Sequence, residues 1–183
     1  MSDEALETLR YPIGRFEPPA SPGAEQVAAW IDDIRTLPAR LRDLVEPFGD
    51  AQLDTPYRPD GWTARQVVHH VADSHVNSFV RFKWALTEDA PVIKAYFEER
   101  WALLPDTLHA PVSLSLDLLD ALHARWCVLL EGLGPEQLER TFLHPDSGPV
   151  RLDANIGIYA WHGRHHQAHV EELARREGWI AAR

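Results

Sequence analysis

Four of the ten histidines in this chain lie within eight consecutive positions, in the segment WHGRHHQAHV at residues 161–170. Imidazole nitrogens are common ligands of zinc and of other divalent transition metals. His162 and His166 are four positions apart, so on a helix they share one face with Cβ atoms about 5–6 Å apart. Two imidazoles at that spacing can bind one cation. The alternative is a helix whose histidines are hydrogen-bonded parts of the core.

The helix that carries these histidines is expected over about residues 153–177, ending at Gly178. At 100° per residue, His165 and His169 fall to one side of its apolar face. That face contains Ile156, Tyr159, His162, His166, Val170 and Leu173. Unpartnered imidazoles on a buried face are costly, so a metal, an acid or water must meet them.

Fourteen prolines divide the rest of the chain. Because proline inside a helix costs about 3 kcal/mol or more, segments with few prolines mark the long helices. We expect such helices at 25–45 with a kink or break at Pro38, from the Thr63–Gln66 capping box to before Pro91, at 113–133, and at 153–177.

The predicted fold class is an all-α four-helix bundle. We expect a single domain over residues 1–183, with residues 1–22 as an extended N-terminal segment and a short hairpin around 141–152. A chain of this length buries roughly 70% of its unfolded surface, so it needs no disulfide to fold.

A third histidine ligand would come from the second helix, where VVHHVADSHVNSF offers His69, His70 and His75. The apolar face of that helix contains His75, whereas His70 lies on the polar side. Periodicity alone therefore leaves the third ligand open.

Composition excludes several classes of protein and site. The single Cys127 excludes an internal disulfide and a cysteine-rich zinc site. The formal charge of −10, without a basic stripe, argues against a nucleic-acid partner. MSDEALETLRYPIGRF lacks the pattern of a signal peptide, and no stretch reaches 18 consecutive apolar residues. We therefore expect a cytoplasmic protein without a membrane partner.

Three separated motifs, in order, resemble the YfiT-like branch of the DinB/YfiT superfamily: YPIGRF, LDTPYRPDGWTARQVVHHVADSHVNSFVRFKWALTE and YAWHGRHHQAHV. The resemblance implies a four-helix bundle whose metal is bound by an H-x-x-D histidine of the second helix and an H-x-x-x-H pair of the fourth. Those positions are His70, His162 and His166. The neighbours His69, His165 and His169 remain alternatives, as does His75, which periodicity favours.

Three neutral imidazoles leave open positions on a metal ion, as a catalytic site requires. We expect Zn²⁺, with Ni²⁺ next, since nitrogen ligands alone do not separate the two. The resemblance implies two reactions on small molecules. The favoured one transfers a low-molecular-weight thiol to an electrophile, and the alternative is hydrolysis by metal-bound hydroxide. A non-catalytic metal-binding stress-response module is the third hypothesis.

Other side chains have weaker predicted roles. Asp73, Asn77 and Arg81 lie at helical spacing from His70, where they could orient a ligand or bind a carboxylate. Cys127, four residues after His123, is interpreted as a packing residue rather than a nucleophile. We expect the loops at 91–112 and 141–152 to set substrate choice. The resemblance also implies a homodimer.

Overall fold

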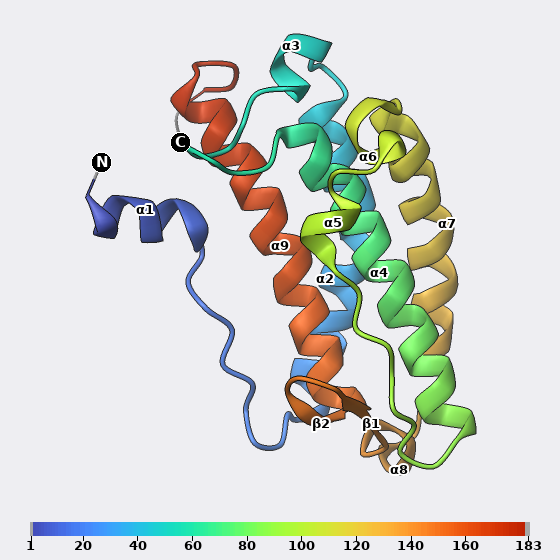
Figure 1. Cartoon of the computed structure of the whole chain (residues 1–183). Coiled ribbons are helices and arrows are strands. Elements are labelled where there is room, and N and C mark those ends of the chain that lie inside the picture. Colours follow the sequence, from blue (N-terminus) through green and yellow to red (C-terminus); the bar gives the residue numbers. More distant parts are fainter. Residues whose placement is uncertain (1, 182–183) are drawn as a thin grey trace.

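The computed structural model describes residues 2–181. Four long helices dominate it: α2 (Ala24–Val45), α4 (Ala64–Thr87), α7 (Val112–Glu131) and α9 (Leu152–Arg176). Both α2 and α4 pack against α7 and against α9, so the order around the bundle is α2, α7, α4, α9 (Figure 1). The predicted all-α four-helix bundle is confirmed, and α4 and α9, the two histidine-rich helices, are neighbours.

Helix α4 begins where the capping box predicts. The Thr63 side chain accepts a hydrogen bond from the backbone N–H of Gln66, and the Thr63 N–H donates to Gln66 Oε1 at 2.9 Å. Two otherwise unpaired backbone donors of the first turn are thereby satisfied. The cap fixes the start of the helix and so the angular position of His70, two turns later.

Helix α2 is one element of 22 residues that runs through Pro38, so of the predicted kink or break at Pro38 the break is wrong. Proline removes one intrahelical hydrogen bond. The Pro38 ring is buried, and the helix around it carries buried apolar side chains from Val27 to Val45. Burial of this apolar face offsets the missing bond.

We expected residues 1–22 to form an extended segment, and this prediction is wrong for part of it. Asp3–Arg10 forms helix α1, whose N-cap is Ser2: its hydroxyl accepts a hydrogen bond from Ala5 N–H at 3.2 Å. Acidic residues in the first turn and a basic residue in the last favour this short helix through its dipole. Residues 15–20 adopt neither helix nor strand before α2 begins.

The expected hairpin is present at the lower end of the bundle (Figure 1). Strands β1 (Thr141–His144) and β2 (Gly148–Arg151) pair antiparallel, with Thr141 opposite Arg151. Gly148 has a φ of +78°, a conformation that glycine adopts without steric cost. The second strand leads directly into α9.

Four short helices lie in the connections: α3 (Asp50–Leu53), α5 (Glu98–Trp101), α6 (Pro105–His109) and α8 (Pro135–Leu138). The connection from α4 to α7 returns along the length of the bundle and includes α5 and α6 (Figure 1). It is fixed to α4 by a buried hydrogen bond from Gln66 Nε2 to the carbonyl oxygen of Ala102, 2.8 Å long. Within residues 2–181, no helix is both long and apolar enough to cross a membrane.

Two apolar clusters fill the core, and a layer of histidines separates them. One cluster includes Leu41, Val67, Leu119 and Leu173, and the other includes Ile34, Phe82, Trp126 and Ile156. Along α9, Ile156 and Tyr159 belong to the second cluster, His162 and His166 follow, and Val170 and Leu173 belong to the first. The imidazoles therefore lie in the middle of the bundle, where partners must be supplied by the protein.

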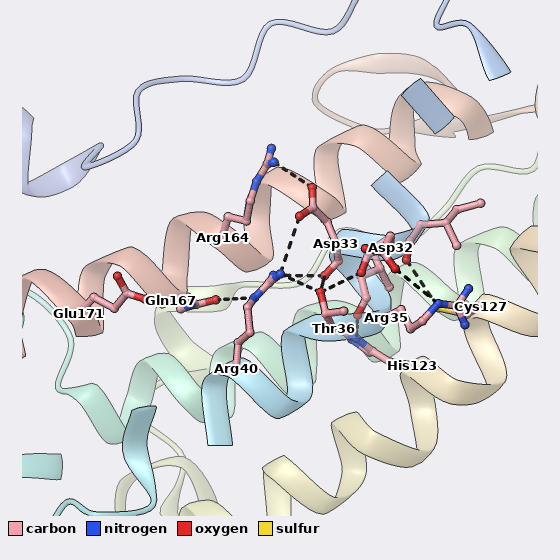
Figure 2. Close-up of polar contacts among 12 residues, drawn as sticks. Asp32, Asp33, Arg35, Thr36, Arg40, His123, Cys127, Arg164, Gln167 and Glu171 are labelled. Carbon is pink, nitrogen blue, oxygen red and sulfur yellow. Dashed lines mark hydrogen bonds and ion pairs between the residues drawn. The ribbon is translucent and has the colours of Figure 1, made fainter. Parts of the chain in front are cut away.

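Helix α9 approaches α2 closely, and polar contacts hold the two in register (Figure 2). Arg164 Nη1 donates to Asp33 Oδ2 at 2.8 Å, and Arg40 Nε donates to Gln167 Oε1 at 3.1 Å. Gly163 permits the approach, because a Cβ atom there would collide with the buried side chain of Leu37.

The same close approach generates a prediction at Gly157. A Cβ atom there would lie 2.7 Å from Phe16 Cζ and 2.9 Å from two ring atoms of Trp30. Overpacking costs about 1–3 kcal/mol, against a gain of about 1 kcal/mol in helix propensity. We expect Gly157→Ala to lower the free energy of unfolding by about 1 kcal/mol, measured by urea denaturation.

Gly132→Ala is the matched control, because its added Cβ atom would meet only backbone oxygens at 3.5 Å. The control should change the free energy of unfolding by less than about 0.5 kcal/mol. Equal stability of the two variants would contradict the packing argument.

Candidate metal centre

His70 from α4 and His162 and His166 from α9 converge in the histidine layer. One ligand atom from each of the three lies within 4.8 Å of the others. Nε2 of His70 is 3.3 Å from Nε2 of His162. Two nitrogens bound to one tetrahedral zinc ion at 2.0–2.1 Å would be about 3.3 Å apart. The structure thus brings together the three predicted residues at a spacing that suits a metal ion.

Burial keeps these imidazoles neutral. His70 and His166 are buried and His162 is half-buried. Burial lowers the pKa of His70 to about 4, with a further contribution from His169. Burial and then the neighbouring imidazoles hold the pKa of His162 and of His166 well below the ordinary value. The neutral imidazole, with a free lone pair, is the form that binds a metal.

His75 is fully buried, as the periodicity of its helix predicted, and lies behind the three histidines. Its Nε2 is 3.2 Å from Nδ1 of His162, and its Nδ1 is 2.9 Å from Nε2 of His123 on α7. His75 therefore contacts a candidate ligand without belonging to the three-histidine group.

The importance of His123 was missed at the level of sequence, where we considered it only as a partner of Cys127. Its Nδ1 lies 2.6 Å from the carbonyl oxygen of Ile34, and its ring stacks on that of His75 with centroids 4.9 Å apart. A histidine within a leucine-rich helix face was the available signal, since a polar group there needs a buried partner.

The remaining candidate ligands lie beside the group. Both nitrogens of His69 are engaged, one with Ser115 Oγ at 2.7 Å and the other with the Ala110 carbonyl oxygen at 3.1 Å. His169 lies with Nδ1 3.4 Å from Nδ1 of His166. His165 stacks on Trp161 at a centroid distance of 4.4 Å, and its buried Nδ1 has no partner among residues 2–181.

A cavity of about 400 Å³ reaches His166 from outside the bundle. Its wall includes His165, His166 and His169 of α9 together with Tyr11 and Tyr57. Its charged lining residues are Glu7, Arg10, Arg15, Arg58, Glu98 and Glu99. A small molecule entering this cavity would arrive beside one of the three converging histidines.

Comparison with known proteins agrees with this geometry. The sequence model of the DinB superfamily matches residues 33–170 of this chain, and that range includes all three converging histidines. The chain belongs to the DinB superfamily. The resemblance inferred from the three motifs is therefore confirmed.

Within the DinB superfamily, the chain is 53% identical over 174 residues to proteins of Bacillus cereus and Bacillus mycoides, each named "putative metal-dependent hydrolase". Those alignments cover 95% of this chain and 100% of each relative.

Two solved structures agree with the fold. YfiT from Bacillus subtilis, described as "a probable metal-dependent hydrolase with an unusual four-helix bundle topology", superposes with a TM-score of 0.93 at 49% identity. That match covers 94% of this chain and 99% of YfiT. The four-helix bundle protein TT2238, at 20% identity and a TM-score of 0.52, supports the fold alone and covers 77% of this chain and 94% of its own.

The polar residues that follow His70 on α4 form no described contact with the three histidines. Asn77 Nδ2 donates to the carbonyl oxygen of Asp73 at 2.8 Å, within the same helix. Arg81 is buried, and its side chain makes no hydrogen bond or ion pair within residues 2–181. Burial, and then Asp106, raise the pKa of Asp73 to about 6. Their role in orienting a ligand stays a prediction.

Cys127 packs as the sequence suggested. It is buried against α2, with Sγ 3.8 Å from the carbonyl oxygen of Ile31, and burial raises the pKa of its thiol (Figure 2). A buried thiol with a raised pKa is a poor nucleophile. His123 is engaged with Ile34 and His75 instead.

The buried histidines predict that the metal-free protein loses stability in mild acid. Burial is the main cause that lowers the pKa of His70, His123 and His169 to about 4. Between about pH 6.5 and pH 4 these residues bind protons when unfolded but not when folded. Each such histidine then lowers the free energy of unfolding by about 1.4 kcal/mol for every pH unit of acidification.

We therefore expect the free energy of unfolding to fall steeply from pH 7 to pH 5 in urea titrations of metal-free protein. Asp73 and Glu98, whose pKa values burial raises, act in the opposite direction but are fewer than the buried histidines. Constant stability over this range would show that the histidines are not held neutral by the fold.

Proposed function

We propose that this chain is a metal-dependent enzyme in which His70, His162 and His166 bind one divalent ion. The observation that carries the proposal is the convergence of three nitrogen donors within 4.8 Å, from two helices that the fold makes neighbours. No carboxylate or thiol within residues 2–181 joins that group. The all-nitrogen donor set supports Zn²⁺ first and Ni²⁺ next.

An ion bound by three neutral imidazoles supplies Lewis acidity and keeps positions open for a water or substrate atom. The chain's own residues position and shield the site. The Trp62 ring lies 4.6 Å from that of His70 and 6.4 Å from that of His166, so an indole covers one side of the histidines. The cavity beside His166 provides the route for a small molecule.

Hydrolysis of a small-molecule substrate is the reaction that the names of the relatives support. Asp73, Asn77 and Arg81 follow His70 at intervals of about one turn on α4, so they would extend the substrate side of the site. With its pKa raised to about 6, the Asp73 carboxyl could hold or release a proton near neutral pH.

Transfer of a low-molecular-weight thiol to an electrophile is the second candidate, favoured by one observation. The only thiol of the chain, Cys127, is buried in the second apolar cluster. A thiol nucleophile would therefore come from solution and enter beside His166.

A homodimer stays a prediction, to be tested by light scattering in solution.

The test is elemental analysis of untagged protein loaded with Zn²⁺ or Ni²⁺, for the wild type beside His70→Ala, His162→Ala and His166→Ala. We expect about one ion per chain in the wild type and its loss in all three variants. His109→Ala, at an exposed histidine of α6, is the matched control and should retain the ion. A wild type that binds no metal would refute the proposal.

Turnover separates the reaction classes. Ester and amide panels test hydrolysis, and thiols paired with electrophiles test transfer, each with wild type and His166→Ala. We expect activity in one panel that disappears in His166→Ala. A loaded protein inactive in both panels would indicate the non-catalytic binding module.

A further inference from the structure

The hydrogen-bonding partners of His162 form a chain that ends on a backbone carbonyl. Nδ1 of His123 is 2.6 Å from the carbonyl oxygen of Ile34. A carbonyl oxygen can only accept, so Nδ1 of His123 carries the proton. A neutral imidazole has one N–H, and Nε2 of His123 is therefore an acceptor.

The same logic passes along the chain to the candidate ligand. Nδ1 of His75 must donate to Nε2 of His123 across 2.9 Å, which makes Nε2 of His75 an acceptor. Nδ1 of His162 then donates to Nε2 of His75 across 3.2 Å. Nε2 of His162 is left with a free lone pair, and it is the atom 3.3 Å from Nε2 of His70.

A second, shorter chain reaches His166. Nε2 of His169 is 3.0 Å from the carbonyl oxygen of Arg10 and must be the protonated nitrogen. Stacking on Tyr57, with centroids 4.1 Å apart, holds this ring. Nδ1 of His169 is then an acceptor for Nδ1–H of His166 across 3.4 Å. Nε2 of His166 is left free as well.

Both chains require neutral linking histidines. His75, His123 and His169 are all buried, at 0%, 1% and 3% exposure, and desolvation disfavours the charged imidazole. Each linking ring therefore carries one proton at neutral pH, and one fixed acceptor at the end of the chain determines where every proton lies.

We propose that His75, His123 and His169 are positioning residues that fix both α9 histidines as Nδ1–H tautomers, so that each presents the Nε2 lone pair to the ion. The use of those lone pairs rests on the proposed function, whereas the tautomers are a property of the metal-free protein. Histidine ligands commonly donate their second N–H to a carboxylate or carbonyl. Here other histidines occupy that place.

His70 differs from the two α9 histidines. Within residues 2–181 its Nδ1 has no described partner, so no acceptor holds a proton on that nitrogen. In the metal-free protein its Nε2–H donates to Nε2 of His162, the only arrangement open to a pair 3.3 Å apart in which His162 is an acceptor. His70 would bind an ion through Nε2 only as the other neutral tautomer, with its proton on Nδ1.

The first experiment is long-range proton–nitrogen NMR of metal-free protein, labelled with ¹⁵N-histidine, at pH 7.5. We expect Nδ1–H tautomers for His75, His123, His162 and His166, and Nε2–H tautomers for His70 and His169. An Nε2–H tautomer at His162 or His166 would overturn the proposal, whatever the variants do.

Variants of His123 then test causation. His123→Phe removes the acceptor for His75, so we expect mixed tautomers at His162 and a loss of Zn²⁺ affinity of about 10- to 100-fold. His123→Gln restores a donor for Ile34 and an acceptor for His75, and should recover most of both. If His123→Phe changes neither, His123 fills space only.

His69→Ala is the matched control, because it removes a buried histidine whose hydrogen bonds lead to Ser115 and Ala110, away from the site. It should lower stability without altering the tautomers of His162. His169→Leu and His169→Gln repeat the comparison on the second chain, which keeps the test decisive if His123→Phe does not fold.

The two proposals can fail separately. Predicted tautomers in a wild type without affinity for Zn²⁺ or Ni²⁺ would refute the metal-dependent function and leave the positioning role. Tight metal binding with Nε2–H tautomers at His162 or His166 in the metal-free protein would refute only the positioning role.

Discussion

The structure depends on one requirement: imidazoles placed between two apolar clusters must find their hydrogen-bond partners inside the protein. Ile34 lies on α2, His123 on α7, His75 on α4 and His162 on α9, so one line of contacts passes through all four long helices. A shift of any helix along the bundle would break a contact within this line. The apolar clusters provide most of the driving force for folding, and the histidine layer restricts how the helices can align.

The same layer supports the proposed cation site at the centre of the bundle. Desolvation disfavours the charged imidazole, which leaves lone pairs available at neutral pH. The apolar clusters above and below exclude alternative partners, and the cavity at His166 keeps one side accessible. Membership of the DinB superfamily accounts for the architecture, while the side chains around the histidines account for the local chemistry.

Much of this arrangement could be predicted from the sequence. Helical spacing selected His162 and His166, and the family motif selected His70 against the apolar periodicity that favoured His75. The periodicity was informative in its own way, because His75 is fully buried. The capping box of α4 and the hairpin before α9 depend on residues that are close in sequence, and such local interactions are kept in the folded protein.

What could not be predicted depends on distant contacts. His123 and Ile34 are 89 positions apart, and no spacing rule joins a side chain to a carbonyl at that separation. Helix α1 was missed because its signals are a single cap and a few charges. Pro38 was expected to kink or break α2, but it does not break the helix, because burial of α2 outweighs one lost hydrogen bond. For the four long helices, the pairwise positions could not be predicted from the sequence, whereas their existence could.

Both histidine chains end on main-chain carbonyls, at Ile34 and Arg10, and every residue type has such a carbonyl. The two terminal hydrogen bonds therefore place no demand on the side chains at these positions, and it is packing in the second apolar cluster that constrains Ile34. The linking positions are restricted to side chains that both donate and accept a hydrogen bond. Selection on this site would act on imidazoles in the interior and on backbone shape at its margins.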